Sequence, residues 1–162
     1  MEVKIKRYKS GKGKGSVKTN NIVIDKEDSW SCAWTIAQIA GPLLKQLKET
    51  SHGYGAIAKE DVPEELHDTY QGGKFSKEAW DWVLDEVVWA MNEIATDNVN
   101  EPFPYDVVGE LGWSEPDERG CVKMLSPSLK EIPGKRALYD AYHARIQNGC
   151  RLFGLYLNTF WD

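Results

Sequence analysis

The feature that most constrains the fold of this chain is an apolar stripe near its middle, in which large side chains recur every three or four residues. Its members are Trp80, Leu84, Val87, Met91 and Ile94. This spacing places them on one face of an α-helix. Ser76 precedes the stripe, and a serine hydroxyl is favoured at a helix N-cap because it accepts a backbone N–H. Since an apolar helix face must be covered, the stripe predicts a long helix packed against another element.

A second helix is predicted from about residue 30 to residue 50, capped by Asp28 or Ser29. Two apolar stripes run along it, so both of its sides are expected to be buried. The stripes are Trp30, Ala33, Ala37, Ala40, Leu44 and Leu47 on one side and Ile36, Ile39 and Leu43 on the other. Pro42 should kink this helix because it has no backbone N–H, and Gly53 should end it in the left-handed conformation.

A third helix is predicted from about Lys135 almost to the end of the chain. Its apolar stripe consists of Leu138, Tyr142, Ile146, Gly149, Phe153, Tyr156 and Phe160. Gly149 and Gly154 carry no side chain, so we expect them to let a neighbouring helix approach closely, at a cost of about 1 kcal/mol each relative to alanine.

Two other stretches predict β-hairpins. Near the N-terminus, the runs 3–8 and 21–25 flank the glycine-rich turn SGKGKGS, and the runs 105–108 and 121–125 flank SEPDERG. Residues 54–75 are predicted to be a loop with one short helical turn in DVPEELHD.

The predicted fold class is therefore α+β and mainly α. Three long helices pack together with an N-terminal β-hairpin and a second short hairpin before the last helix. One domain is expected over residues 1–162, divided into a basic hairpin (1–27), a helical segment (28–97), a hairpin insert (98–134) and the C-terminal helix (135–162).

Charge and composition limit the function classes. The net charge is −5, but seven basic residues lie within the first eighteen positions against Glu2 alone, so the rest of the chain is acidic. An acidic body disfavours binding to nucleic acid. No apolar run approaches the roughly 20 residues that span a bilayer, so no membrane association is expected. The three cysteines, Cys32, Cys121 and Cys150, lie far apart, and no secretory signal precedes them, which indicates a reduced cytoplasmic protein.

The candidate ligand-binding residues lie in the last predicted helix and on the central one. Arg145, Gln147, Asn148 and Arg151 could read phosphates and base edges, with His143 on the same face as Gln147. Trp82 and Trp89 lie off the main stripe of the central helix and could stack a nucleobase. The alternative is that the polar set binds the acidic loop around Glu64 and Glu65, or another subunit, and that the indoles belong to the core.

A cluster of carboxylates offers a different chemistry. Asp81 and Asp85 lie four residues apart, and Glu64 and Glu65 belong to an acidic preceding loop, so together they could hold Mg²⁺ for hydrolysis. Solvated acidic faces are the commoner arrangement. The histidines have no metal-ligand spacing and no nucleophile motif is present, so the sequence predicts no catalytic residue, no metal site and no cofactor.

Five blocks of the sequence carry a family resemblance: DSW at 28–30, LLKQLKETSHG at 43–53, EDVPEEL at 60–66, WDWVLDEVVWA at 80–90 and RIQNGCRLFGLY from 145, followed by FWD. Together they resemble a family of small proteins encoded by tailed phages. The resemblance covers about a third of the chain and implies a phage origin and expression inside a bacterial host. The resemblance implies no particular activity and no catalytic residues.

Three functions follow from these expectations. The first is a homo-oligomeric phage accessory protein that sequesters a nucleotide-type immune signalling molecule of the host without cleaving it. The second is a metal-dependent nucleotide hydrolase that uses the clustered carboxylates. The third is a protein–protein adaptor or minor structural phage protein, with exposed tryptophans as the contact surface.

Overall fold

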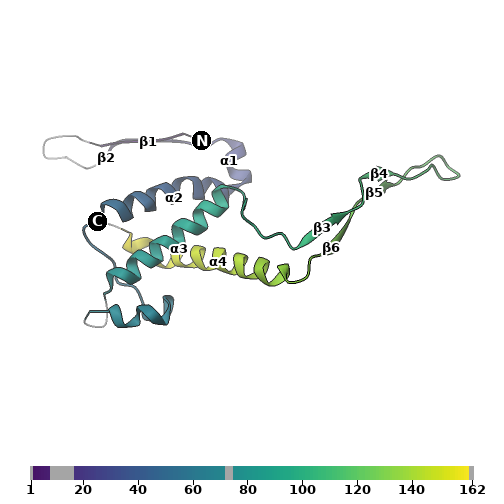
Figure 1. Cartoon of the computed structure of the whole chain (residues 1–162). Helices are drawn as coiled ribbons and strands as arrows, with labels where there is room; N and C mark the ends of the chain where they lie inside the picture. Colours follow the sequence, from purple (N-terminus) through teal and green to yellow (C-terminus); the bar gives the residue numbers. More distant parts are fainter. Residues whose placement is uncertain (1, 8–16, 72–74, 161–162) are drawn as a thin grey trace.

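A computed structural model describes residues 2–7, 17–71 and 75–160. Three helices form its body: α2 (Cys32–Thr50), α3 (Lys77–Ala95) and α4 (Lys135–Tyr156). The central helix α3 packs against both α2 and α4 (Figure 1). A turn of 3₁₀-helix, η3 (Leu157–Thr159), follows α4. With its small antiparallel hairpins the chain is α+β and mainly α, as the sequence predicts.

The core is built around the apolar stripe of α3. Trp80, Leu84, Val87 and Met91 are buried and Ile94 is half-buried against the core, which confirms the predicted stripe. The helix begins after Ser76, whose hydroxyl accepts the N–H of Ala79 at 3.0 Å, as expected of an N-cap. The neighbouring helices contribute Ala37, Ala40 and Leu44 from α2 and Ile146, Leu152 and Tyr156 from α4.

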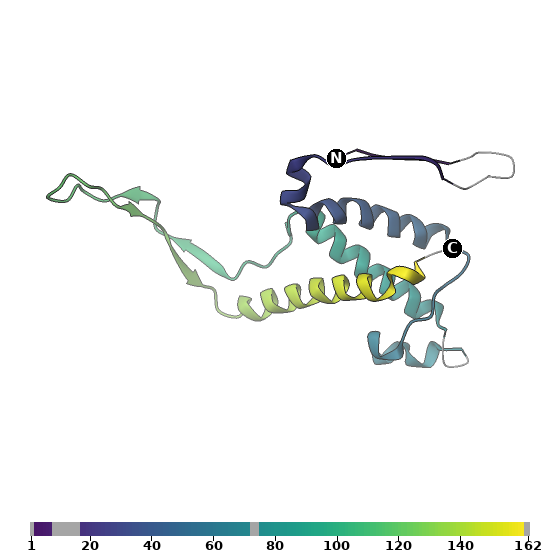
Figure 2. The ribbon, with the colours of Figure 1, turned by 180° about the vertical axis from the view of Figure 1, so that it is seen from behind.

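The N-terminal hairpin pairs β1 (Glu2–Arg7) with β2 (Val17–Val23) in antiparallel register, with Glu2 opposite Val23. This part of the predicted hairpin is present, whereas its glycine-rich turn lies outside the described residues. In Figures 1 and 2 its described strands lie above α2.

The start of the first long helix differs from the prediction. A separate short helix, α1 (Lys26–Trp30), precedes α2, and Ser31 between them leaves the helical conformation with φ −119° and ψ 56°. Asp25 caps α1, and its N–H donates to the Asp28 carboxylate at 2.9 Å. The prediction of Asp28 or Ser29 as the cap of one continuous helix is therefore wrong by one helical turn.

The end of α2 also differs. The helix stops at Thr50, where the N–H of Ser51 donates to the carbonyl of Leu47 at 2.8 Å. Gly53 lies beyond this point and does not adopt a positive φ, so it is not the expected left-handed stop. The acidic loop then forms two short 3₁₀-helices, η1 (Lys59–Asp61) and η2 (Glu64–Thr69), in place of the single predicted turn.

The second hairpin is a long two-tiered arm, here defined as residues 105–131. Its base pairs β3 (Tyr105–Val108) with β6 (Ser128–Glu131), and its outer tier pairs β4 (Gly112–Trp113) with β5 (Met124–Leu125). Figures 1 and 2 show the arm projecting away from the helices. The predicted hairpin is thus present, but its base uses Ser128–Glu131 as the returning strand.

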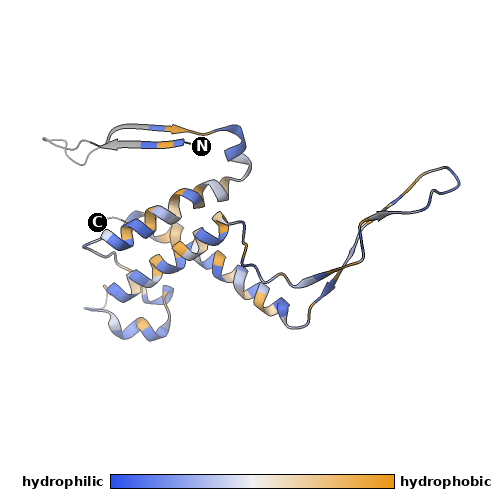
Figure 3. Cartoon of the chain, turned by 45° about the horizontal axis from the view of Figure 1, so that its top comes forward, coloured by the Kyte–Doolittle hydropathy of each residue, from blue (hydrophilic) through white to orange (hydrophobic). Residues whose placement is uncertain are grey.

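One side of α2 is open, contrary to the prediction that both sides are buried. Because α3 covers only the side with Ala37, Ala40 and Leu44, the second stripe of α2 stays at the surface. Figure 3 shows hydrophobic and hydrophilic residues alternating along the helices. Ile36, Ile39 and Leu43 keep 48%, 40% and 64% of their surface exposed. Trp30 on α1 and Leu138 at the start of α4 are likewise exposed, although each was assigned to a buried stripe.

Candidate ligand-binding site

Arg145 on α4 lies over the indole ring of Trp89 on α3. Its guanidinium carbon is 4.0 Å from the centroid of the indole ring. The Nε and Nη2 groups donate to the two oxygens of Glu86 at 2.9 and 2.7 Å, so the carboxylate holds the guanidinium in a fixed plane. The hydrogen bond to Glu86 raises the pKa of Arg145 above its usual range, which keeps the group charged. The Arg145 side chain is nevertheless 49% exposed.

A shallow pocket of about 360 Å³ adjoins this pair. Tyr142 forms one wall, and its ring meets Trp89 edge to face with 5.7 Å between the centroids. Asn100 and Pro102, from the segment that leads into the arm, close another side. The pocket therefore combines two aromatic rings, a fixed cation and an amide, the kinds of group that bind flat, charged ligands.

A buried carboxylate lies behind the pocket. Glu93 on α3 is only 6% exposed, and it accepts hydrogen bonds from the hydroxyl of Tyr142 at 2.6 Å and from Asn100 Nδ2 at 3.0 and 3.2 Å. Burial and the bond to Glu93 raise the pKa of Tyr142 well above its usual range, so its hydroxyl keeps its proton. These bonds fix the Tyr142 ring and join α3, α4 and the segment before the arm.

His143 has a similar tie to that segment. Its Nε2 lies 2.5 Å from Glu101 Oε1, and its ring lies against Tyr139 with 4.3 Å between the centroids. His143 thus lies next to the pocket, but its Nε2 already contacts the carboxylate of Glu101. Neither Glu93 nor Glu101 is among the residues that the sequence suggested, because a single glutamate on a helix or in a loop carries no motif.

Arg151 belongs to a different cluster at the other end of α4. Its Nη1 donates to Asp61 Oδ1 at 2.6 Å, and its Nε and Nη2 donate to Asn148 Oδ1 at 3.1 and 2.9 Å. The hydroxyl of Tyr156 donates to Asp61 Oδ2 at 2.6 Å and accepts the N–H of Ala58 at 3.0 Å. This network fastens α4 to η1.

The hydrogen bonds of this network shift the pKa values of Tyr156 and Asp61. Burial and the hydrogen bond to Asp61 raise the pKa of Tyr156 to about 12. Burial alone would raise the pKa of Asp61, but the hydrogen bonds from Tyr156 and Arg151 outweigh it and hold the pKa below its ordinary value. Asp61 is therefore charged at neutral pH.

The predicted ligand set is consequently divided. Arg145 and Arg151 bind separate carboxylates, Glu86 and Asp61, while Gln147 is exposed on α4. The alternative prediction was that these arginines bind acidic parts of the chain. Both arginines do so, although their partners are not Glu64 and Glu65. Only Trp89 of the two candidate indoles meets an arginine, since Trp82 packs against the core as a half-buried ring.

The carboxylates proposed for a metal site do not converge. Asp81 pairs with Lys77 and Asp85 with Lys48, each at 2.5 Å. Within residues 2–7, 17–71 and 75–160, no group of three or more His, Cys, Asp or Glu side chains is close enough to hold a metal ion. In the same part of the chain, no helix is long and apolar enough to cross a membrane.

Comparison with known proteins gives no family assignment: the chain matches no family model, no curated protein and no solved structure.

Proposed function

We propose that this chain binds and sequesters a nucleotide-type signalling molecule without cleaving it, in the cytoplasm of a phage-infected bacterium. The observation that carries the proposal is the Arg145 guanidinium, which Glu86 holds over Trp89 by two hydrogen bonds while almost half of its side chain stays exposed. A fixed, planar cation with an open outer face is a stacking surface that needs no reorganisation when a ligand arrives.

Different groups of this pocket would bind the base, the phosphate and the apolar edge of a nucleotide. A base can stack on the outer face of Arg145, with Trp89 supporting the inner face. Glu86 engages Nε and Nη2, so Nη1 is the guanidinium nitrogen that is left to donate to a phosphate oxygen. The apolar edge of the ligand would lie against Leu138 and Tyr142, which line the same pocket.

The test is calorimetric titration of the protein with a panel of cyclic dinucleotides and cyclic ADP-ribose isomers. For a ligand that binds, Arg145→Lys keeps the charge but removes the planar stacking group, and we expect affinity to fall roughly tenfold, the equivalent of about 1.4 kcal/mol. Arg151→Lys is the matched control because it alters an arginine that contacts Asp61, away from the pocket. Absence of binding by the whole panel at micromolar protein would refute the proposal.

Recovery of the bound ligand distinguishes sequestration from hydrolysis. The protein is incubated with the same ligand and Mg²⁺ or Mn²⁺, and the ligand is then analysed by mass spectrometry. We expect intact ligand. Cleavage that is lost in Asp81→Asn or Asp85→Asn would instead support the hydrolase, which the lysine-paired arrangement of these carboxylates does not favour.

A protein–protein adaptor is the second candidate, and exposed tryptophans are the observation in its favour. Trp30 on α1 keeps 73% of its surface exposed and Trp113 on the arm keeps 68%. Exposed indoles of this kind are frequent anchors of protein interfaces. A host protein that co-purifies in stoichiometric amount with the wild type, but not with Trp113→Ser, would support the adaptor.

A further inference from the structure

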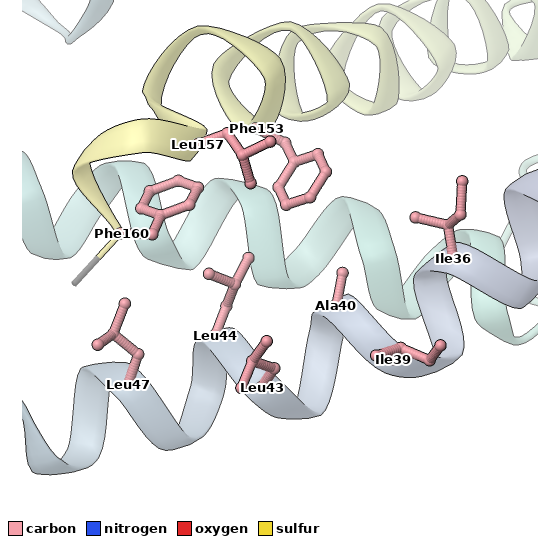
Figure 4. A pocket seen from close by; sticks show the side chains of 9 residues that line it. All are labelled: Ile36, Ile39, Ala40, Leu43, Leu44, Leu47, Phe153, Leu157 and Phe160. Carbon is pink, nitrogen blue, oxygen red and sulfur yellow. The ribbon is translucent and has the colours of Figure 1, made fainter. Parts of the chain in front are cut away.

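An apolar groove of about 370 Å³ lies between α2 and the end of α4. Its walls are Ile36, Ile39, Leu43 and Leu47 on α2, Phe153 on α4 and Leu157 on η3. Figure 4 shows the side chains of the two helices facing one another across the gap. All of its lining residues are hydrophobic, so the groove offers a partner shape and apolar surface but no charge.

The groove is continuous with the core. Ala40 and Leu44 line it and are only 7% and 3% exposed, because their other sides pack within the body. The rim residues are open: Leu43 is 64% exposed and Leu157 is 53% exposed. The same apolar layer that joins α2 to α3 thus extends to the surface without a cover.

The chain exposes more surface than a compact monomer of the same mass. The accessible surface is 11849 Å², whereas a compact monomer of 18.4 kDa exposes about 8,200 Å² by the scaling of surface with mass. The difference is about 3,600 Å². A permanent homodimer buries about 2,000–5,000 Å² in total, or about 1,000–2,500 Å² per copy, so a contact with a second copy needs less surface than each chain exposes in excess.

We propose that the α2–α4 groove is the contact face of a homodimer, in which a second copy of this chain presents the same groove. The face suits a symmetric pair because it is uncharged, so that two identical copies bring no like charges together there despite their net charge of −5. Ile36, Ala40, Leu43 and Leu47 follow the 4-3-4 spacing with which two helices interlock side by side.

The symmetry fixes which side chains meet. If two antiparallel copies of α2 cross between Ile39 and Ala40, then Leu43 of one copy lies opposite the position of Ile36 in the other. Leu43 stands at the rim as the most exposed of the leucines on this face and is suited to enter the groove of the second copy. Each copy then fills the groove of the other.

The test is light scattering after size-exclusion chromatography at micromolar concentration. We expect a dimer for the wild type and a monomer for Leu43→Glu, which places a carboxylate in an apolar contact. Leu155→Glu is the matched control: this leucine is 56% exposed on α4 but does not line the groove, so its variant stays dimeric. Circular dichroism confirms that both variants are folded, as expected from changes at exposed positions.

A charge exchange tests the paired geometry. Ile36→Lys is expected to be monomeric by itself, but in a mixture with Leu43→Glu it should form a heterodimer in which the new lysine and glutamate meet. With an affinity tag on one variant, the untagged variant co-purifies. A heterodimer supports the antiparallel crossing, and mixed variants that remain monomeric overturn it.

Three results would overturn the dimer proposal. They are a monomeric wild type, an assembly that Leu43→Glu leaves intact, and a complex whose mass is that of one copy plus a different molecule. The proposal does not depend on the nucleotide site, because Arg145 lies about 12 Å along α4 from Phe153. Arg145→Lys is expected to lose the nucleotide and keep the dimer, so failure of one proposal is distinguishable from failure of the other.

Discussion

At Gly149, α4 comes very close to α3. A Cβ atom at this position would lie 2.4 Å from Ala90 Cβ and 2.9 Å from the backbone oxygen of Glu86. Since backbone cannot move aside easily, Gly149→Ala is expected to lower the free energy of unfolding by about 1–3 kcal/mol. Urea denaturation measures this change.

Gly154, five residues further along the same helix, is the matched control. A Cβ atom there would meet no heavy atom within 4 Å. Alanine is the better helix former, so Gly154→Ala should stabilise the protein by up to about 1 kcal/mol. Equal destabilisation by the two variants would contradict the close approach at Gly149. The sequence suggested both glycines for this role, and only one of them has a neighbouring helix against it.

Asp61 should make stability depend on pH in the acid range. Its pKa in the folded chain lies below the ordinary value of 3.8, so the stability that it contributes is complete above that value and is lost as the pH falls through the lowered pKa. We expect Asp61→Asn to be less stable than the wild type at pH 7, and the difference between them to shrink below pH 3.8.

Urea denaturation at a series of pH values measures that difference. Asp68→Asn, which alters an exposed carboxylate of the neighbouring η2, is the control and should show a smaller effect at pH 7. A constant difference between the wild type and Asp61→Asn across the acid range would show that Asp61 does not titrate with unfolding.

The binding residues show what sequence spacing reveals at this scale. It selects Arg145 and Trp89 by residue type and helical position, and both lie at the candidate pocket. It does not reveal that Glu86 holds Arg145 or that Asp61 holds Arg151, because these partners are 59 and 90 positions away. Helical spacing states which residues share a face, whereas the packing of one helix on another decides which faces meet.

At the level of elements, α3 is buried in the core, whereas the arm has no covering layer among the described residues. Val83, Leu84 and Val87 are fully buried, whereas Val107, Trp113 and Leu129 on the arm are each at least 59% exposed. A two-stranded ribbon without a covering layer is marginally stable in water. Hydrogen exchange should therefore show amides of the arm exchanging by local opening, and amides of α3 only with unfolding of the body. Equal protection of both would mean that the arm is covered by another part of an assembly.

A comparison of α3 with α2 shows what a sequence pattern can predict about an element and what it cannot. The α3 stripe was predicted residue by residue because one helix face meets one core. The second stripe of α2 has the same periodicity but no element over it, and periodicity alone cannot tell a covered face from an open one. The break at Ser31 leaves no signal in the periodicity, because the residues on both of its sides form helix.

For the whole molecule, the proposed dimer predicts a thermal stability that depends on protein concentration. A second copy that binds only the folded chain stabilises it by mass action, so the Tm of the wild type should rise with protein concentration. Leu43→Glu should have a Tm that does not change with concentration, and Leu155→Glu should behave as the wild type does. Differential scanning calorimetry over a range of concentrations makes this comparison. A wild-type Tm that is independent of concentration would argue against self-association.

The arm has one further consequence, which concerns how the chain can be divided. It separates α3 from α4 in the sequence but not in space, because these two helices pack directly against each other. A cut beside Arg119 or Lys123, both exposed near its tip, would leave α2 and α3 in one fragment and α4 in the other. The two fragments should remain bound through the contacts of Gly149, Leu152 and Tyr156, so this protein can be made as a split pair that reassembles from separately produced halves.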